Sequence, residues 1–287
     1  MKFPTGPYVG STAALATMHK KELAIAVPFA AALGVSLRVT GDVDTDGLGT
    51  FAGEVERAGT PRDVAVRKAR MGMKAAGLEL GVANEGTFGA HPYMPFSAVD
   101  HELIVFVDDS RGIVITESVL WPQTNSATIA VSPIDELDVF LGRALFPSHA
   151  VIVRPNDRIE SSSIQKGICD LSLLRKSVSE AAASSADGLA RLETDMRASF
   201  NPTRMGVIRR VAFRLARRLA TACPGCSAPG WGRIRVEDGL PCSLCGTPTE
   251  MARGEVLGCL ACDREEFRPR ADGMIHADPR HCQVCNP

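Results

Sequence analysis

Eight of the nine cysteines in this 287-residue chain form four Cys-x-x-Cys pairs within residues 223–287, and this repeat constrains the fold more than any other feature. Two residues between thiols let both sulfurs of a tight turn face one ion, and two such turns complete a tetrahedral site of four thiolates. The pairs are Cys223/Cys226, Cys242/Cys245, Cys259/Cys262 and Cys282/Cys285. We therefore predict that residues 223–287 form a small double zinc ribbon around two structural zinc ions.

Two other uses of paired cysteines fit this chain less well. The first residues contain no apolar stretch typical of a secretory signal, and disulfides are rare in the cytosol. A single redox reaction does not need four repeated pairs. The pairing of the knuckles stays open at this point: neighbours could share an ion, first with second and third with fourth, or the arrangement could be nested. The ninth cysteine, Cys169, is expected to be a small buried residue.

Composition and charge describe a globular chain with three parts. The sequence is 45% hydrophobic and 23% charged, and no apolar run reaches the roughly 18 residues that span a bilayer. We expect a cytoplasmic protein without a membrane partner. The net charge of −1 averages an acidic segment, a basic segment and a mildly acidic one. We accordingly expect a domain over residues 1–190, a helical connector over 191–222 and the zinc-binding domain over 223–287.

Strand and helix patterns alternate through residues 1–190, which predicts an α/β layer fold. Thr60-Pro61 supplies an N-cap and a first-turn proline for a helix that Gly77 ends. Residues 103–107 and 113–116 form a predicted hairpin, which makes the sheet mixed.

Polar residues gather where this fold places chemistry, at strand ends. Thr17, His19 and Lys21 lie where a strand runs into a helix, whose free N–H groups could hold phosphates. Glu56 precedes the helix capped by Thr60, and Lys68 lies on that helix. Glu85 is predicted to leave a strand directly into a glycine-rich turn, where a carboxylate could bind Mg²⁺ or activate a water.

Four segments resemble the inosine/xanthosine triphosphate pyrophosphatase superfamily. One of them, Lys166-Gly167-Ile168 with the helix expected after it, resembles a late G-A-I-x-x-L-T segment of that superfamily. Glu56, Thr60, Ala65 and Lys68-Ala69-Arg70 follow the spacing of its E-x-G-x-T-F-x-x-N-A-x-x-K-A-R segment. Ala16-Thr17 with His19 resembles its opening A-T-x-N strand end, and residues 80–86 resemble its L-G-x-G-x-E-G turn. Val64 and His19 stand where the superfamily has asparagine. The whole layout, with residues 193–198 and 201–205, is also similar to an uncharacterised bacterial family.

The resemblance implies a Mg²⁺-dependent enzyme that cleaves a phosphoanhydride of a nucleoside triphosphate. Carried over by position, Glu56 and Glu85 would be metal or base carboxylates, and Lys68 would contact phosphate. Thr17 and His19 would line the triphosphate end. In this interpretation the chain is an ITPase-like hydrolase with a zinc-ribbon tail.

The connector supports an alternative from another class of function. Residues 203–221 have apolar residues at helical spacing, with six arginines from Arg204 to Arg218 at most other positions. Such a helix either docks on the α/β domain or contacts a phosphate backbone, because zinc ribbons next to arginine helices often bind nucleic acid. The alternative is therefore a non-catalytic zinc-ribbon protein that binds nucleic acid or protein.

Overall fold

The computed structural model describes residues 4–41, 59–91, 94–133 and 135–287, and it divides the chain into two compact units. One unit spans Tyr8–Leu215. The other combines Ala216–Pro287 with the N-terminal segment that ends at Pro7.

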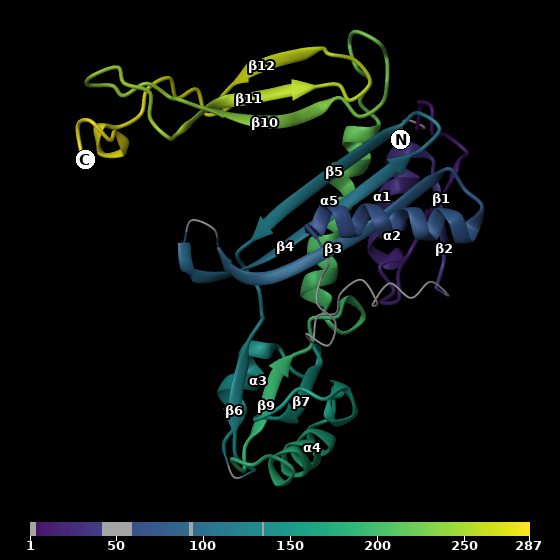
Figure 1. Ribbon diagram of the computed structural model, residues 1–287, viewed down its shortest axis with the longest axis vertical. Coiled ribbons are helices and arrows are strands. Elements are labelled where there is room, and N and C mark those ends of the chain that lie inside the picture. The colour runs from purple at the N-terminus through teal and green to yellow at the C-terminus, as the bar shows by residue number, and fades with distance from the viewer. Residues whose placement is uncertain (1–3, 42–58, 92–93, 134) are drawn as a thin grey trace. The chain divides into compact units, whose positions relative to one another are not determined.

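A five-stranded mixed sheet forms the centre of the unit Tyr8–Leu215, with the order β2-β1-β3-β4-β5 (Figure 1). The strands are β1 (Thr12–Leu15), β2 (Ser36–Val39), β3 (Leu80–His91), β4 (Met94–Asp108) and β5 (Ile113–Trp121). β1 runs parallel to β2 and β3, whereas β3, β4 and β5 are antiparallel. The predicted α/β class and the predicted hairpin are therefore confirmed.

Helix α2 (Pro61–Ala76) covers one face of this sheet. The Thr60 side chain accepts a hydrogen bond from the Asp63 N–H, and Gly77 ends the helix with a left-handed φ of 65°, as the sequence predicts. Buried alanines of α2 pack on the aliphatic side chains of β3 and β4. The close approach of helix and strand requires a glycine at position 81, where a Cβ would lie 2.6 Å from Met73.

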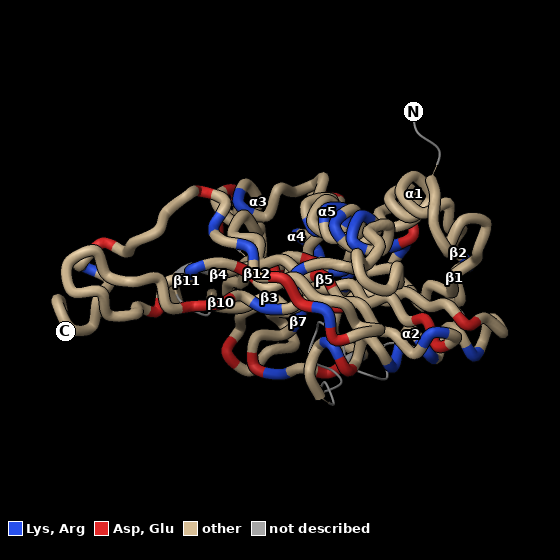
Figure 2. The backbone as a smooth tube through the Cα atoms, turned by 90° about the horizontal axis from the view of Figure 1, so that it is seen from above, with Lys and Arg blue, Asp and Glu red and all other residues tan. Residues whose placement is uncertain are grey.

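Helices α1 (Glu22–Leu33) and α5 (Pro202–Leu219) cover the opposite face (Figure 2). Phe29 of α1 packs against Phe106 of β4. The Arg210 guanidinium of α5 lies 4.4 Å from the centroid of the Trp121 ring on β5. The apolar residues predicted for one side of α5, such as Ile208 and Leu215, are fully buried, which is the amphipathic pattern read from the sequence.

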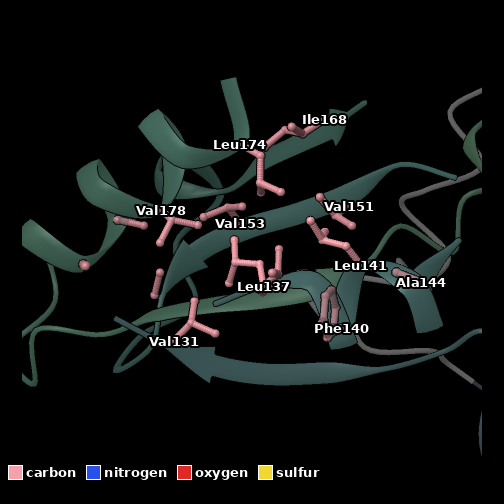
Figure 3. Close-up of a cluster of buried hydrophobic side chains, with 14 residues drawn as sticks. Val131, Leu137, Phe140, Leu141, Ala144, Val151, Val153, Ile168, Leu174 and Val178 are labelled. Carbon is pink, nitrogen blue, oxygen red and sulfur yellow. The ribbon is translucent and has the colours of Figure 1, made fainter. Parts of the chain in front are cut away.

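A second, antiparallel sheet with the order β6-β9-β7-β8 belongs to the same unit. Helices α3 (Asp138–Ala144) and α4 (Leu171–Ala183) accompany its strands β6 (Thr128–Val131), β7 (Val151–Pro155), β8 (Gln165–Ile168) and β9 (Ala190–Thr194). Figure 3 shows their shared core, in which Leu174 and Val178 of α4 meet Val153 of β7. Residue 190, the expected end of the first domain, is the first residue of the inner strand β9, so the compact unit continues to Leu215.

The other unit contains a three-stranded antiparallel sheet, in the order β10-β11-β12. Its strands are β10 (Gly232–Asp238), β11 (Ala252–Gly258) and β12 (Glu265–Pro269). Among the residues that the model describes, no helix has the length and apolar character needed to cross a membrane.

Candidate functional site

The candidate site lies where β1 ends beside a longer strand. The last β1 residue to pair with β3 is Leu15, opposite Val82, but β3 continues to His91. The part of β3 that starts at Asn84 therefore extends beyond the carboxyl end of β1, and the turn formed by residues 17–21 lies beside it. Carboxyl ends of parallel strands are the usual place for ligands in open α/β sheets.

Lys68 and Glu85 form a buried ion pair on the α2 face of the sheet. The Nζ of Lys68 lies 2.5 Å from Oε1 of Glu85, and the two side chains are 9% and 5% exposed. Helix α2 and the next strand, β3, thus bring together two of the three residues predicted to be catalytic. The third, Glu56, lies outside the described residues.

Lys21 reaches the same edge of the sheet from the N-terminus of α1. Its Nζ donates a 3.2 Å hydrogen bond to the backbone carbonyl oxygen of Asn84. The pKa of Lys21 is lowered to about 8, chiefly by burial and next by the positive charge of Arg204, with a smaller contribution from Lys68, while the carboxylates Glu85 and Glu102 oppose the shift. Lys21 is thus within electrostatic range of charged residues on both faces of β3 and β4.

A second charged group lies on the α5 face, because successive strand residues point to opposite sides of a sheet. The Arg204 Nε donates a 2.6 Å hydrogen bond to Oε1 of Glu102, and the Asn84 Nδ2 donates a 2.6 Å bond to Oε2 of the same carboxylate. The side chains of Arg204 and Glu102 are fully buried. Arg204 also donates to the carbonyl oxygen of Met196, so it joins α5, β4 and the segment after β9.

Gly86 shows how closely the second group packs on β3. It lies opposite Glu102 in the β3–β4 register. A Cβ at this position would meet the Glu102 carboxylate and would lie 2.6 Å from an Arg204 nitrogen. The glycine-rich turn predicted after Glu85 is wrong: Gly86 continues strand β3, and glycine is needed there because the Arg204–Glu102 pair occupies the space above it.

Asp100 precedes Glu102 by two residues on β4, so the two carboxyl groups share one face of the strand. Asp100 is 2% exposed and Glu102 is not exposed at all. Burial raises the pKa of Asp100 to about 8, with the Glu102 charge as the next contribution, while Arg204 acts in the opposite direction. Carboxyls two residues apart inside a hydrophobic strand are a signal that sequence reasoning could have used here and missed.

Thr17 and His19, predicted to bind the triphosphate, both lie in the turn between β1 and α1. Thr17 is buried, and its hydroxyl accepts a hydrogen bond from the His19 N–H at 3.3 Å. His19 is half-buried in the same turn, which also contains Lys20 with a left-handed φ of 55°. Non-glycine residues rarely adopt this conformation, and such strain is concentrated at functional sites.

Four of the α5 arginines make contacts within the unit Tyr8–Leu215. Arg204 is buried in its pair with Glu102, Arg209 donates to the carbonyl oxygen of Leu23, Arg210 stacks on Trp121 and Arg214 pairs with Glu117 at 3.7 Å. These contacts match the docked-helix interpretation of the arginine pattern.

Two groups of four cysteines could each hold one metal ion. One group contains Cys223, Cys226, Cys259 and Cys262, and the other contains Cys242, Cys245, Cys282 and Cys285. The sulfurs of Cys223 and Cys262 are 3.8 Å apart, and those of Cys245 and Cys282 are 3.6 Å apart. Tetrahedral zinc with bonds of about 2.3 Å holds its sulfurs about 3.8 Å apart, whereas a disulfide needs about 2.05 Å. The donor set and its spacing fit zinc.

The pairing of the knuckles is interleaved, first with third and second with fourth, so both arrangements considered from the sequence are wrong. The physical reason is the antiparallel register of the small sheet. Gly232 at the start of β10 pairs with Gly258 at the end of β11, which brings the first and third knuckles to one end. The second and fourth knuckles follow β10 and β12 and meet at the other end.

The strand length separates the two metal sites. β10 and β11 have seven residues each, which corresponds to about 20 Å of sheet. Trp231 and Leu257 pack against Cys223 at the first site and form the small hydrophobic core of the unit. At both sites backbone N–H groups donate to sulfur, from Gly225 to Cys223 and from Leu244 to Cys242. The remaining cysteine, Cys169, is exposed and not buried as expected.

Comparison with known proteins assigns most of the chain to a family. A family model described as Domain of unknown function (DUF6671) matches residues 68–287. The matched range begins at Lys68 and contains Glu85, Glu102 and Arg204 together with all eight paired cysteines. No curated protein and no solved structure matches the chain significantly.

Proposed function

The chain belongs to this family of unknown function, and we propose from its own geometry that the unit Tyr8–Leu215 is a Mg²⁺-dependent hydrolase of nucleotide phosphoanhydrides. The observation that carries the proposal is the buried Lys68–Glu85 pair at the carboxyl end of β1, with the Lys21 ammonium nearby. Structural zinc ions in the two cysteine groups complete the proposed holoprotein.

The charges of the site suit a phosphate ligand that arrives with a divalent cation. Lys21 and Lys68 are compact ammonium groups of the kind that bind phosphate oxygens. Glu85 offers the oxygen ligand that Mg²⁺ prefers. A bound Mg²⁺ would polarise the phosphoryl group and offset the negative charge that develops as the anhydride breaks. Lys68 would then transfer its contact from Glu85 to a phosphate oxygen. In this scheme Lys68 binds the phosphate and Glu85 binds the Mg²⁺.

The resemblance to the inosine/xanthosine triphosphate pyrophosphatase superfamily adds the substrate class. In that superfamily the bond cleaved joins the α- and β-phosphates. Residues 16–19, 65–70 and 80–86 carry part of the resemblance, and these three segments border the site described above. Glu56 would supply a further carboxylate in the same scheme.

The test is a screen of canonical and non-canonical nucleoside triphosphates with Mg²⁺, with pyrophosphate and inorganic phosphate measured separately. We expect pyrophosphate release from at least one nucleotide. In the Glu85→Gln variant the rate should fall about 10²–10³-fold. Exchanging the exposed surface carboxylate Asp109 for asparagine should leave the rate unchanged and serves as the control. Absence of release from every nucleotide would overturn the proposal.

The second candidate is a non-catalytic protein that binds nucleic acid through α5 and the zinc-binding unit. Arg209, Arg210 and Arg217 are exposed on α5. If they neutralised phosphates, the slope of log affinity against log salt would fall by about 0.9 for each arginine replaced by glutamine. The intramolecular contacts of Arg209 and Arg210 favour the docked role, for which we expect no change in the slope.

A further inference from the structure

Two carboxyl groups and one guanidinium are enclosed together on the α5 face of β4. Asp100 and Glu102 project from the same side of the strand, and Arg204 contacts Glu102 from α5. The β3 and β5 residues that lie opposite Asp100 are Phe88 and Trp121, which carry no charge. Among the residues that the structure describes, the charges that act on Asp100 are those of Glu102 and Arg204. Lys21, at the N-terminus of α1, interacts electrostatically with Glu102 and Arg204.

The charge of this enclosure does not balance if both carboxyls are ionised. Arg204 offsets one negative charge, and its Nε already donates to Glu102. The second Glu102 oxygen accepts from Asn84. Glu102 is thus the carboxylate with two donors. A second unshielded carboxylate at Asp100 would be buried at a large cost in solvation.

The hydrogen bonding of Asp100 points to a neutral acid. Within the part of the chain that the model describes, its Oδ1 atom is buried without a hydrogen-bond partner. An anionic oxygen in that position would be far more costly than the carbonyl oxygen of a neutral acid. The neutral acid also has an O–H that can donate to Glu102.

We propose that Asp100 and Glu102 hold one proton between them, with Asp100 as the neutral acid that donates a hydrogen bond to the Glu102 carboxylate, and that this proton keeps Glu102 aligned with Asn84 and Arg204. Loss of the proton places two carboxylates against one guanidinium. The repulsion then loosens the contacts that hold Asn84, and Asn84 directly precedes Glu85 on β3. Asp100 is a positioning residue in this scheme. Its effect on turnover rests on the proposed hydrolase function, whereas the shared proton does not.

The sign of the pH effect follows from the raised pKa of Asp100, which burial and Glu102 move from its ordinary value of 3.8 to about 8. Between these two pH values the folded protein keeps a proton that the unfolded chain has lost. Raising the pH through this window therefore favours unfolding. The stability that this proton contributes is fully present below the unfolded-state pKa of 3.8. It is lost as the pH rises through the folded-state pKa of about 8.

The experiment uses the full chain with its zinc and the Trp231→Phe substitution, so that Trp121 alone reports denaturant unfolding of the unit Tyr8–Leu215. Asp100→Asn keeps a hydrogen-bond donor toward Glu102 but cannot titrate. Between pH 5 and 7 the ratio of the unfolding constants, parent to Asp100→Asn, should rise about tenfold for each pH unit. Asp109→Asn, which removes an exposed carboxyl paired with Arg70, should show no such change.

Infrared spectroscopy of the parent protein supplies an arm that needs no variant. We expect one protonated carboxyl band at pH 6 that disappears above pH 8 and that Asp100→Asn lacks. If the parent shows no such band, or if the ratio of unfolding constants is flat with pH, the shared proton is refuted. Where a nucleotide substrate has been found, Asp100→Asn should also remove the alkaline fall in turnover. If no nucleotide substrate is found, the stability and infrared measurements still test the shared proton.

Discussion

The Nζ of Lys68 lies 2.5 Å from Oε1 of Glu85, and neither side chain is more than 9% exposed. Two residues 17 positions apart, one on α2 and one on β3, thus place opposite charges together in the interior of a domain. Removing one partner would leave the other charge buried and unpaired. This arrangement makes the pair measurable through stability as well as through activity.

The first prediction concerns this pair. Lys68→Met and Glu85→Gln should each destabilise the unit Tyr8–Leu215 by about 3–5 kcal/mol, because each leaves a buried charge without its counterion. The double variant should be less destabilised than the sum of the two. Denaturant unfolding followed by Trp121 fluorescence, in protein that carries Trp231→Phe, measures the cycle. Additive single effects would mean that the two side chains do not interact.

The second prediction uses two glycines of β3 as a matched pair. Gly86→Ala introduces a Cβ against the Glu102 carboxylate and Arg204, so we expect a loss of about 1–3 kcal/mol. Gly89→Ala in the same strand meets open space and should change stability by less than about 0.5 kcal/mol. Equal effects of the two substitutions would contradict the placement of the Arg204–Glu102 pair above Gly86.

The third prediction concerns the pairing of the zinc knuckles. Metal analysis of the purified chain should give two zinc ions. Cys223→Ser with Cys259→Ser removes ligands from one group only and should leave one zinc, whereas Cys223→Ser with Cys242→Ser removes ligands from both groups and should leave none. Neighbouring pairs would give the reverse result. Cys169→Ser is the control that keeps two.

The fourth prediction is a pH dependence from Lys21, whose pKa is lowered to about 8, chiefly by burial. Between pH 8 and about 10.4, the usual lysine pKa, the unfolded chain binds a proton that the folded protein does not. Stability from this group therefore rises with pH in that window. Lys21→Met should abolish the rise, while Lys20→Met, at the exposed neighbouring position, should retain it. A rise that persists in Lys21→Met would assign it to another group.

Several features of this protein were determined by the sequence alone because they depend on local chemistry. Thr60, Pro61 and Gly77 specify the two ends of α2 through a cap, a fixed φ and a left-handed turn. The apolar spacing of α5 specifies which side is buried. The Cys-x-x-Cys repeat specifies the eight residues that can hold metal, because two thiols at that spacing can face one ion in any fold.

Only the tertiary structure decided how distant residues combine. The knuckles pair in an interleaved order because the register of β10, β11 and β12 sets which turns meet at each end of the sheet, and register is a property of paired strands. The sequence pattern around Arg204 is that of an exposed arginine in a connector helix. Arg204 is nevertheless buried against Glu102, because α5 packs on the face of β4 opposite α2. Gly86 reads as a turn residue and is instead the part of β3 that this guanidinium covers. In each case the arrangement is stabilised by contacts between residues on different elements of the fold. Local sequence patterns do not specify such contacts.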